Sequence, residues 1–159
     1  RQLERDHPQA FASLQYMEQP MDRELSNARY SLKPLIEWKP IIADESLSSL
    51  PALEQLDALG WSGIALKTCK GHSLALIAYC WAKSRDRYVT MQDLTNVGHA
   101  FVHAANLASH LALSTEALEY NSRQYAPDSQ AEVQKDYHGL FQVRDGSIHL
   151  EAIRHIGLY

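Results

Sequence analysis

The sequence predicts an α/β protein in which short parallel strands alternate with helices, as in part of a (β/α)8 barrel. Five short apolar runs recur along the chain, at residues 15–20, 40–46, 63–69, 88–93 and 117–121. Their polar ends, taken as Glu18, Asp44, Lys67, Asp93 and Asn121, are successively 26, 23, 26 and 28 residues apart. A strand, a helix and two loops need about that length, so each interval accommodates one strand–helix unit.

The choice of a barrel depends on where the polar residues fall. Alternating strands and helices fit either an open doubly wound sheet or a barrel. An open sheet normally carries a glycine-rich phosphate loop, and neither G-x-G-x-x-G nor G-x-x-x-x-G-K-[ST] occurs here. Polar residues at the ends of consecutive strands are typical of a barrel. We therefore expect a partial barrel over residues 1–125 and a C-terminal tail over residues 126–159, with a small hairpin around Asp145-Gly146.

Helices are expected in the intervals between the runs. Mixed charge with scattered apolar residues predicts a helix over residues 21–38, interrupted at Pro34. Leucine at every third position predicts an amphipathic helix over residues 47–59. Further helices are expected over residues 72–85, which are strongly apolar, and over residues 97–113, which are rich in alanine and histidine.

Composition and charge exclude several classes of protein. The chain has 159 residues and a net charge of −4, with no Lys/Arg cluster near its aromatic residues, so nucleic acid is not an expected partner. Its longest apolar stretch, residues 74–82, is too short to cross a membrane. No secretion signal opens the chain, and Cys69 and Cys80 match no metal or redox spacing. A reduced, cytoplasmic protein is therefore expected.

Three of the polar strand ends predict a catalytic centre. Glu18 and Asp44 would lie at the mouths of adjacent strands, where two carboxylates repel one another unless a cation or a proton lies between them. Oxygen ligands without a nearby His/Cys set favour Mg²⁺, with Mn²⁺ as the alternative. Lys67, at the end of the next strand, would be disfavoured in its ammonium form by such a cation, which suits a general base.

The same residues carry a resemblance to a known family. The segments Y-M-E-Q-P (residues 16–20), I-A-D-E-S (residues 42–46) and A-L-K-T-C-K-G (residues 65–71) resemble the enolase superfamily in order and spacing. They most resemble its muconate-lactonising and dipeptide-epimerase-like branch. The mandelate-racemase branch carries a His on its seventh strand and an Asp on its sixth, whereas this chain has Gln92-Asp93 and Lys67 there.

The resemblance implies roles for individual residues. Glu18 and Asp44 would be the second and third metal ligands, and Lys67 the catalytic lysine of a K-x-x-K pair. Glu45, Lys70, Asp93 and Asn121 would bind substrate or support the site. The five runs would be about strands four to eight of the barrel. The chain would then be the C-terminal part of a larger enzyme, and this part would lack the first metal ligand. Its tail, V-x-D-G-x-I-x-L at residues 143–150, is similar to the family's closing segment, which returns to the cap domain.

The implied reaction is Mg²⁺-assisted removal of a proton α to a carboxylate, through an enediolate. The outcome would be racemisation or epimerisation, cycloisomerisation or dehydration of a small carboxylate-bearing substrate, and the full-length protein would be compatible with a homo-oligomer.

Two alternatives stay open. A truncated or degenerate barrel could serve as a non-catalytic structural or interaction module. A zinc hydrolase could instead use His99, His103 and His110, which share one face of a helix.

Overall fold

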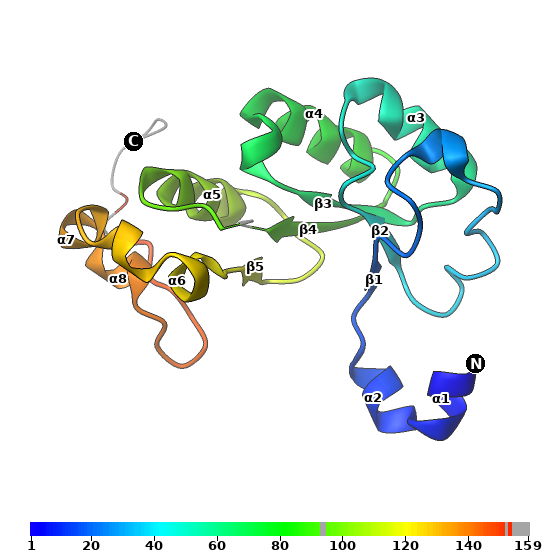
Figure 1. Cartoon of the computed structure of the whole chain (residues 1–159), viewed down its shortest axis with the longest axis horizontal. Coiled ribbons are helices and arrows are strands. Elements are labelled where there is room, and N and C mark those ends of the chain that lie inside the picture. Colours follow the sequence, from blue (N-terminus) through cyan, green and yellow to red (C-terminus); the bar gives the residue numbers. More distant parts are fainter. Residues whose placement is uncertain (93–94, 152, 154–159) are drawn as a thin grey trace. The chain divides into compact units, whose positions relative to one another are not determined.

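The computed structural model describes residues 1–92, 95–151 and 153 (Figure 1). Within these residues the strands are hydrogen-bonded in the order β1-β2-β3-β4-β5. Their bounds are β1 (Met17–Glu18), β2 (Ile41–Ala43), β3 (Gly63–Leu66), β4 (Tyr88–Gln92) and β5 (Leu118–Glu119). The pairs β1–β2, β2–β3 and β4–β5 are parallel. All five predicted strands are confirmed, each shorter than the apolar run that predicted it.

The chain folds as two compact units. The first unit comprises residues 1–65 and 76–89, and the second comprises residues 66–75 and the described residues from 90 onward. The order of strands and helices is that of an α/β protein and is consistent with part of a (β/α)8 barrel. No helix in the described ranges combines the length and the hydropathy needed to cross a membrane.

The first unit is built on strands that are buried on both faces. Every residue of β2 and β3 is buried, as is usual for parallel strands covered by helices. Helix α3 (Leu50–Leu59) buries Leu53 and Leu56, whereas Leu50 stays partly exposed. It ends at Gly60, whose left-handed φ of 86° is an ordinary helix stop. Helix α4 (His72–Lys83) precedes β4, and the exposed helices α1 (Gln2–Asp6) and α2 (Pro8–Ser13) precede β1.

The helix predicted over residues 21–38 is wrong. This segment contains a short 3-10 turn, η1 (Leu25–Asn27), and otherwise consists of bends and turns. The carboxylate of Asp22 accepts hydrogen bonds from the backbone N–H of Glu24 (3.0 Å) and from the side chain of Asn27 (3.3 Å). Such local side-chain bonds compete with helical ones. They also hold the pKa of Asp22 below its usual value.

The second unit packs around helix α5 (His99–His110). Phe101, Val102 and Ala105 from this helix share a buried cluster with Val133, Leu140 and Phe141. The ring of Phe101 stacks on that of Tyr120, with centroids 4.1 Å apart, just beyond β5. This apolar cluster therefore joins the last strand, α5 and the tail. The remaining elements are the short segments η2 (Thr68–Lys70), α6 (Ser122–Tyr125), η3 (Pro127–Gln130), α7 (Val133–Asp136) and α8 (His138–Phe141).

The turn predicted at Asp145-Gly146 is present. Arg144 and Ser147 form an antiparallel bridge in which each backbone N–H donates to the other's carbonyl at 2.8 Å. The two residues between them have φ values of 51° and 76°. Positive φ at both central residues is the geometry that an Asp-Gly hairpin turn requires.

Candidate active site

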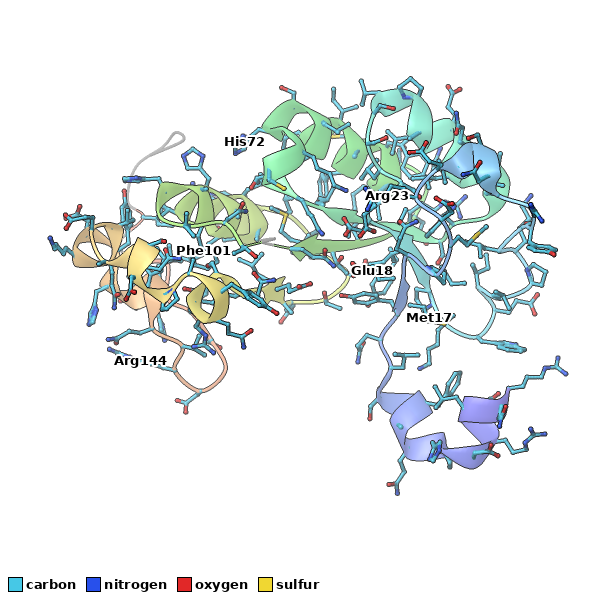
Figure 2. All side chains as sticks on the ribbon, in the orientation of Figure 1. Met17, Glu18, Arg23, His72, Phe101 and Arg144 are labelled. Atoms are coloured by element: carbon cyan, nitrogen blue, oxygen red, sulfur yellow. The ribbon has the colours of Figure 1, made fainter. Side chains whose placement is uncertain are left out.

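Two predicted site residues, Glu18 and Asp44, lie at the ends of adjacent strands of the first unit. Parallel pairing sets Glu18, the last residue of β1, opposite Ile42 in β2. Asp44 follows β2 directly and is 3% exposed, whereas Glu18 is exposed (Figure 2). A buried carboxylate is stable only when cations or hydrogen-bond donors compensate for its lost hydration. The burial of Asp44 therefore requires compensating partners, and its part as a metal ligand stays a prediction.

The loops that follow these two strands are joined by one side chain. The Oε1 atom of Gln19 accepts hydrogen bonds from the backbone N–H groups of Asp44 (2.9 Å) and Ser46 (3.2 Å). Its Nε2 donates to Ser46 Oγ (2.7 Å) and to the carbonyl of Met21 (3.2 Å). Sequence reasoning assigned no role to Gln19 or Ser46. Both belong to the motif segments. Each is a polar residue at the end of an apolar run, and this pattern could have revealed them.

A shallow pocket lies beside Glu18 in the first unit. It is lined by Glu18, Gln19, Met21, Arg23 and Glu45. Glu45, predicted as a substrate-binding or supporting residue, is exposed and shares this pocket with Glu18. Arg23, which follows β1 in the chain (labelled in Figure 2), adds a guanidinium to the two carboxylates. The lining therefore presents both signs of charge to a small polar ligand.

Lys67 and Lys70 belong to the second unit. Lys67 directly follows β3 and is 6% exposed, and its carbonyl accepts a hydrogen bond from the N–H of Lys70 at 3.2 Å. Thr68, between them, is buried, and its Oγ1 accepts a hydrogen bond from Asn96 Nδ2 at 3.4 Å. Asn96 is a buried polar residue that the sequence did not single out. Lysine is seldom this buried unless its ammonium is paired, so burial alone assigns no chemistry to Lys67, and its part as a catalytic base stays a prediction.

The last two predicted residues follow β4 and β5. Asp93 lies outside the described residues. Asn121 comes shortly after β5, and its Oδ1 accepts hydrogen bonds from the backbone N–H (2.8 Å) and the hydroxyl (2.9 Å) of Thr95. These bonds tie the loop after β4 to the end of β5. Asn121 thus has a structural role, and a contact with substrate stays a prediction.

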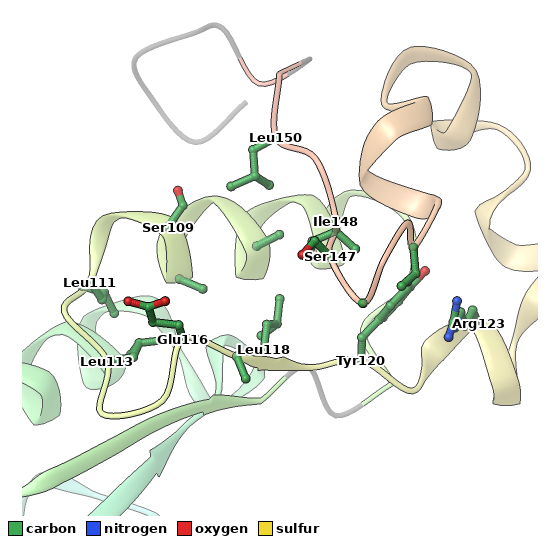
Figure 3. A pocket seen from close by; sticks show the side chains of 15 residues that line it. Ser109, Leu111, Leu113, Glu116, Leu118, Tyr120, Arg123, Ser147, Ile148 and Leu150 are labelled. Atoms are coloured by element: carbon green, nitrogen blue, oxygen red, sulfur yellow. The ribbon is translucent and has the colours of Figure 1, made fainter.

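A second hollow lies in the second unit, between α5, β5 and the hairpin (Figure 3). It has a volume of about 590 Å³, and its lining includes the apolar residues Leu118, Ile148 and Leu150 together with polar groups. Glu116 and Arg123 are its charged residues. None of the predicted site residues lines it, so it is distinct from the motif-bearing strand ends.

The histidine stripe on α5 does not converge on one point. The ring of His103 meets that of His72 edge-on with centroids 5.3 Å apart, and His99 meets Tyr137 in the same way at 6.3 Å. His110 Nδ1 lies 2.8 Å from the carbonyl of Asn106. Across the described ranges, no three His, Cys, Asp or Glu side chains form a metal-binding group. Within the part of the chain that the structure describes, the histidines of α5 therefore do not form the ligand set that a zinc site requires.

By donor type alone, the carboxylates of Glu18 and Asp44 suit a magnesium or manganese ion, although they belong to no group of three possible ligands among the described residues. Mg²⁺ is commonly held by one or two protein carboxylates, with water and substrate completing its six ligands. Glu18 and Asp44 supply two oxygen donors from neighbouring strands. A third carboxylate is not needed for such a site, although the family resemblance implies one.

Two solved structures share this fold. One is the dipeptide epimerase from Cytophaga hutchinsonii, in complex with Mg and the dipeptide D-Ala-L-Val, at 24% identity and a TM-score of 0.56 over 70% of this chain. The other is a substrate-liganded complex of the L-Ala-D/L-Glu epimerase from Bacillus subtilis, at 21% identity and a TM-score of 0.60 over 76% of this chain. The sequence matches no protein-family model and no curated protein.

The matches extend over only part of those enzymes. This chain spans 31% of the Cytophaga hutchinsonii enzyme and 34% of the Bacillus subtilis enzyme. Its fold therefore matches that of about a third of each of these two epimerases. The resemblance drawn from the sequence motifs is confirmed at the level of the fold.

Proposed function

We propose that this chain is the C-terminal barrel segment, about strands four to eight, of a longer enzyme that removes the α-proton of a small carboxylate. The favoured reaction is epimerisation of a dipeptide, and the favoured cation is Mg²⁺. The proposal is supported by the order in which Glu18, Asp44 and Lys67 occur at the ends of successive strands of one sheet. They end or follow the consecutive strands β1, β2 and β3, and two of them are buried.

Each residue has a defined part in this scheme. Glu18 and Asp44 would hold the cation through their carboxylate oxygens. When bound, the cation would supply positive charge that stabilises the negative charge developing on the substrate carboxylate. The neutral amine of Lys67 would take the α-proton, and the C–H electron pair would pass into the carboxylate. Lys67 would then be an ammonium that can return the proton to the same face.

Inversion needs a second proton donor on the opposite face of the substrate. The described residues do not identify that donor, and we assign it to another segment of the longer enzyme. Lys67 alone therefore accounts for exchange of the α-proton with solvent, whereas the complete enzyme is needed for epimerisation. Exchange is for this reason the better assay of the role of Lys67.

The proposal is tested with the full-length protein that contains this chain. A panel of dipeptides is incubated in D₂O with Mg²⁺, and loss of the α-proton signal is followed by NMR. Lys67→Ala should slow exchange by about 10²- to 10⁴-fold, the usual contribution of a positioned general base. Lys83→Ala, an exposed lysine at the end of α4, is the matched control and should leave the rate unchanged. Undiminished exchange in Lys67→Ala would overturn the role of this lysine.

Removal of the cation separates the enzyme from the non-catalytic alternative. EDTA should abolish exchange in the wild-type protein, and added Mg²⁺ or Mn²⁺ should restore it. A folded full-length protein that exchanges none of the dipeptides and does not respond to either ion would favour a structural or interaction module instead.

A further inference from the structure

Gln19 has a backbone conformation that needs support from its surroundings. Its φ is +39°, in the left-handed region that is strained for a residue other than glycine. Its backbone N–H donates to the carbonyl of Ile42 at 3.0 Å, which continues the pairing of β1 with β2. Such strain persists only where neighbouring contacts hold the residue in place.

The side-chain amide of Gln19 supplies those contacts. A glutamine amide can accept two hydrogen bonds and donate two, and all four are made here. Both acceptor bonds go to the loop after β2, at Asp44 N and Ser46 N. One donor bond reaches Ser46 Oγ in that loop, and the other reaches the carbonyl of Met21 in the loop after β1.

The bridge continues through Ser46 to the pocket beside Glu18. Ser46 is 2% exposed, and its Oγ donates to the carbonyl of Arg23 at 2.9 Å. Gln19 and Ser46 together therefore connect both strand-end loops of the first unit. The side chains of Glu18 and Asp44 leave the backbone directly beside these connections.

We propose that Gln19 is a positioning residue for the cation-binding carboxylates, and this inference rests on the function proposed above. Its amide accepts a hydrogen bond from the backbone N–H of Asp44 and thereby fixes the position of that backbone relative to the end of β1. Because a carboxylate has few rotatable bonds, the position of its backbone decides where its oxygens lie. Gln19 thus determines the separation of the oxygens of Glu18 and Asp44 without touching the cation.

Glutamine is the side chain that meets these requirements. Asparagine is one methylene shorter, so it cannot reach both Asp44 N and Ser46 Oγ from the same backbone position. Leucine has nearly the same volume but can neither accept nor donate. Gln19→Leu therefore removes all four bonds while leaving the space filled, and Ser46→Ala removes the bond to Ser46 Oγ and the bond from it to Arg23.

The experiment measures cation affinity and amide protection in the full-length protein that contains this chain and in its variants. Mn²⁺ affinity is obtained from the free-ion signal in electron paramagnetic resonance, and amide hydrogen exchange is followed by NMR at Asp44 and Ser46. Gln19→Leu should weaken Mn²⁺ binding about 10- to 100-fold, the usual effect of losing a residue that supports a metal ligand. Ser46→Ala should give a smaller loss. Both variants should speed amide exchange at residue 44.

Two controls separate positioning from loss of stability. Gln55→Leu alters an exposed glutamine on α3 in the same unit and should change Mn²⁺ affinity by less than about twofold, as expected for surface sites. Leu56→Ala opens a cavity in the same unit and should lower its urea midpoint. It should nevertheless leave Mn²⁺ affinity in the folded protein near the wild-type value, because Leu56 takes no part in the hydrogen bonds of Gln19 and Ser46.

The outcomes distinguish this inference from the proposed function. Wild-type affinity for Mn²⁺ in Gln19→Leu would overturn the positioning role, as would equal losses in Gln19→Leu and Leu56→Ala. A wild-type full-length protein with no Mn²⁺ affinity would count against the cation site itself. In that case unchanged amide exchange at Asp44 in Gln19→Leu would overturn the bridge as well, and faster exchange would support it.

Discussion

Gly63, the first residue of β3, lies so close to β4 that a side chain has no room. A Cβ atom built at this position lies 2.6 Å from the Cβ of Tyr88 and 2.8 Å from its carbonyl carbon, and it also meets the carbonyl oxygen. Because two of these atoms are backbone, no change of rotamer relieves the overlap. Gly63→Ala should therefore force the start of β3 away from β4.

The expected loss of stability follows from these contacts. Overpacking a close contact costs about 1–3 kcal/mol. Separating the strands also weakens the hydrogen bond from Tyr88 N–H to the carbonyl of Ser62, now 2.9 Å long, which contributes about 1 kcal/mol. We therefore expect Gly63→Ala to lower the free energy of unfolding by about 2–4 kcal/mol. Adding Tyr88→Ala should not restore it, since the overlapping backbone atoms remain.

Tryptophan fluorescence measures this loss in the first unit alone. The three tryptophans of the chain, Trp38, Trp61 and Trp81, all belong to that unit. With a urea slope of about 2 kcal/mol per molar, a loss of about 3 kcal/mol lowers the midpoint by roughly 1.5 M. Ser48→Thr adds one methyl group at an exposed position of the same unit and is the matched control. A Gly63→Ala midpoint equal to that of Ser48→Thr would refute the close approach of β3 and β4.

Three smaller predictions test other contacts. Burial raises the pKa of Tyr88 above its ordinary value of 10.0, so above that pH the folded state keeps a proton that the unfolded state releases. The free energy of unfolding should therefore fall as the pH rises above 10.0, and the urea midpoint of Tyr88→Phe should lack that decline. Asn121→Ala should cost about 1 kcal/mol and speed amide exchange at Thr95, whereas unchanged exchange would contradict the loop tie. Arg87→Met removes the partly exposed ion pair with Asp57, so it should lower the first unit's stability by less than about 1 kcal/mol in low salt, with the difference vanishing in 1 M NaCl.

The arrangement of strands was predictable because their signals are local. The apolar runs at residues 40–46 and 63–69 contain buried strands, since such runs suit positions covered on both faces. The helix ending at Gly60 was likewise encoded by leucine spacing and a stop residue. The predicted helix over residues 21–38 was wrong because its charge pattern does not reveal that the Asp22 carboxylate bonds to nearby backbone and side-chain N–H groups instead.

By itself, the sequence determined which residues lie at or directly after the ends of β1, β2 and β3, and hence which of those side chains are candidates for chemistry. The order of Glu18, Asp44 and Lys67 along the chain depends only on the strand period and the motifs. Tertiary structure alone decided how those ends are held. The bonds of Gln19 to Asp44 and Ser46 cross 25 and 27 positions of sequence, and the pairing of β1 with β2 brings their partners together. Local propensity cannot encode such contacts, because they arise only when separate strands pair and exclude water from the groups between them.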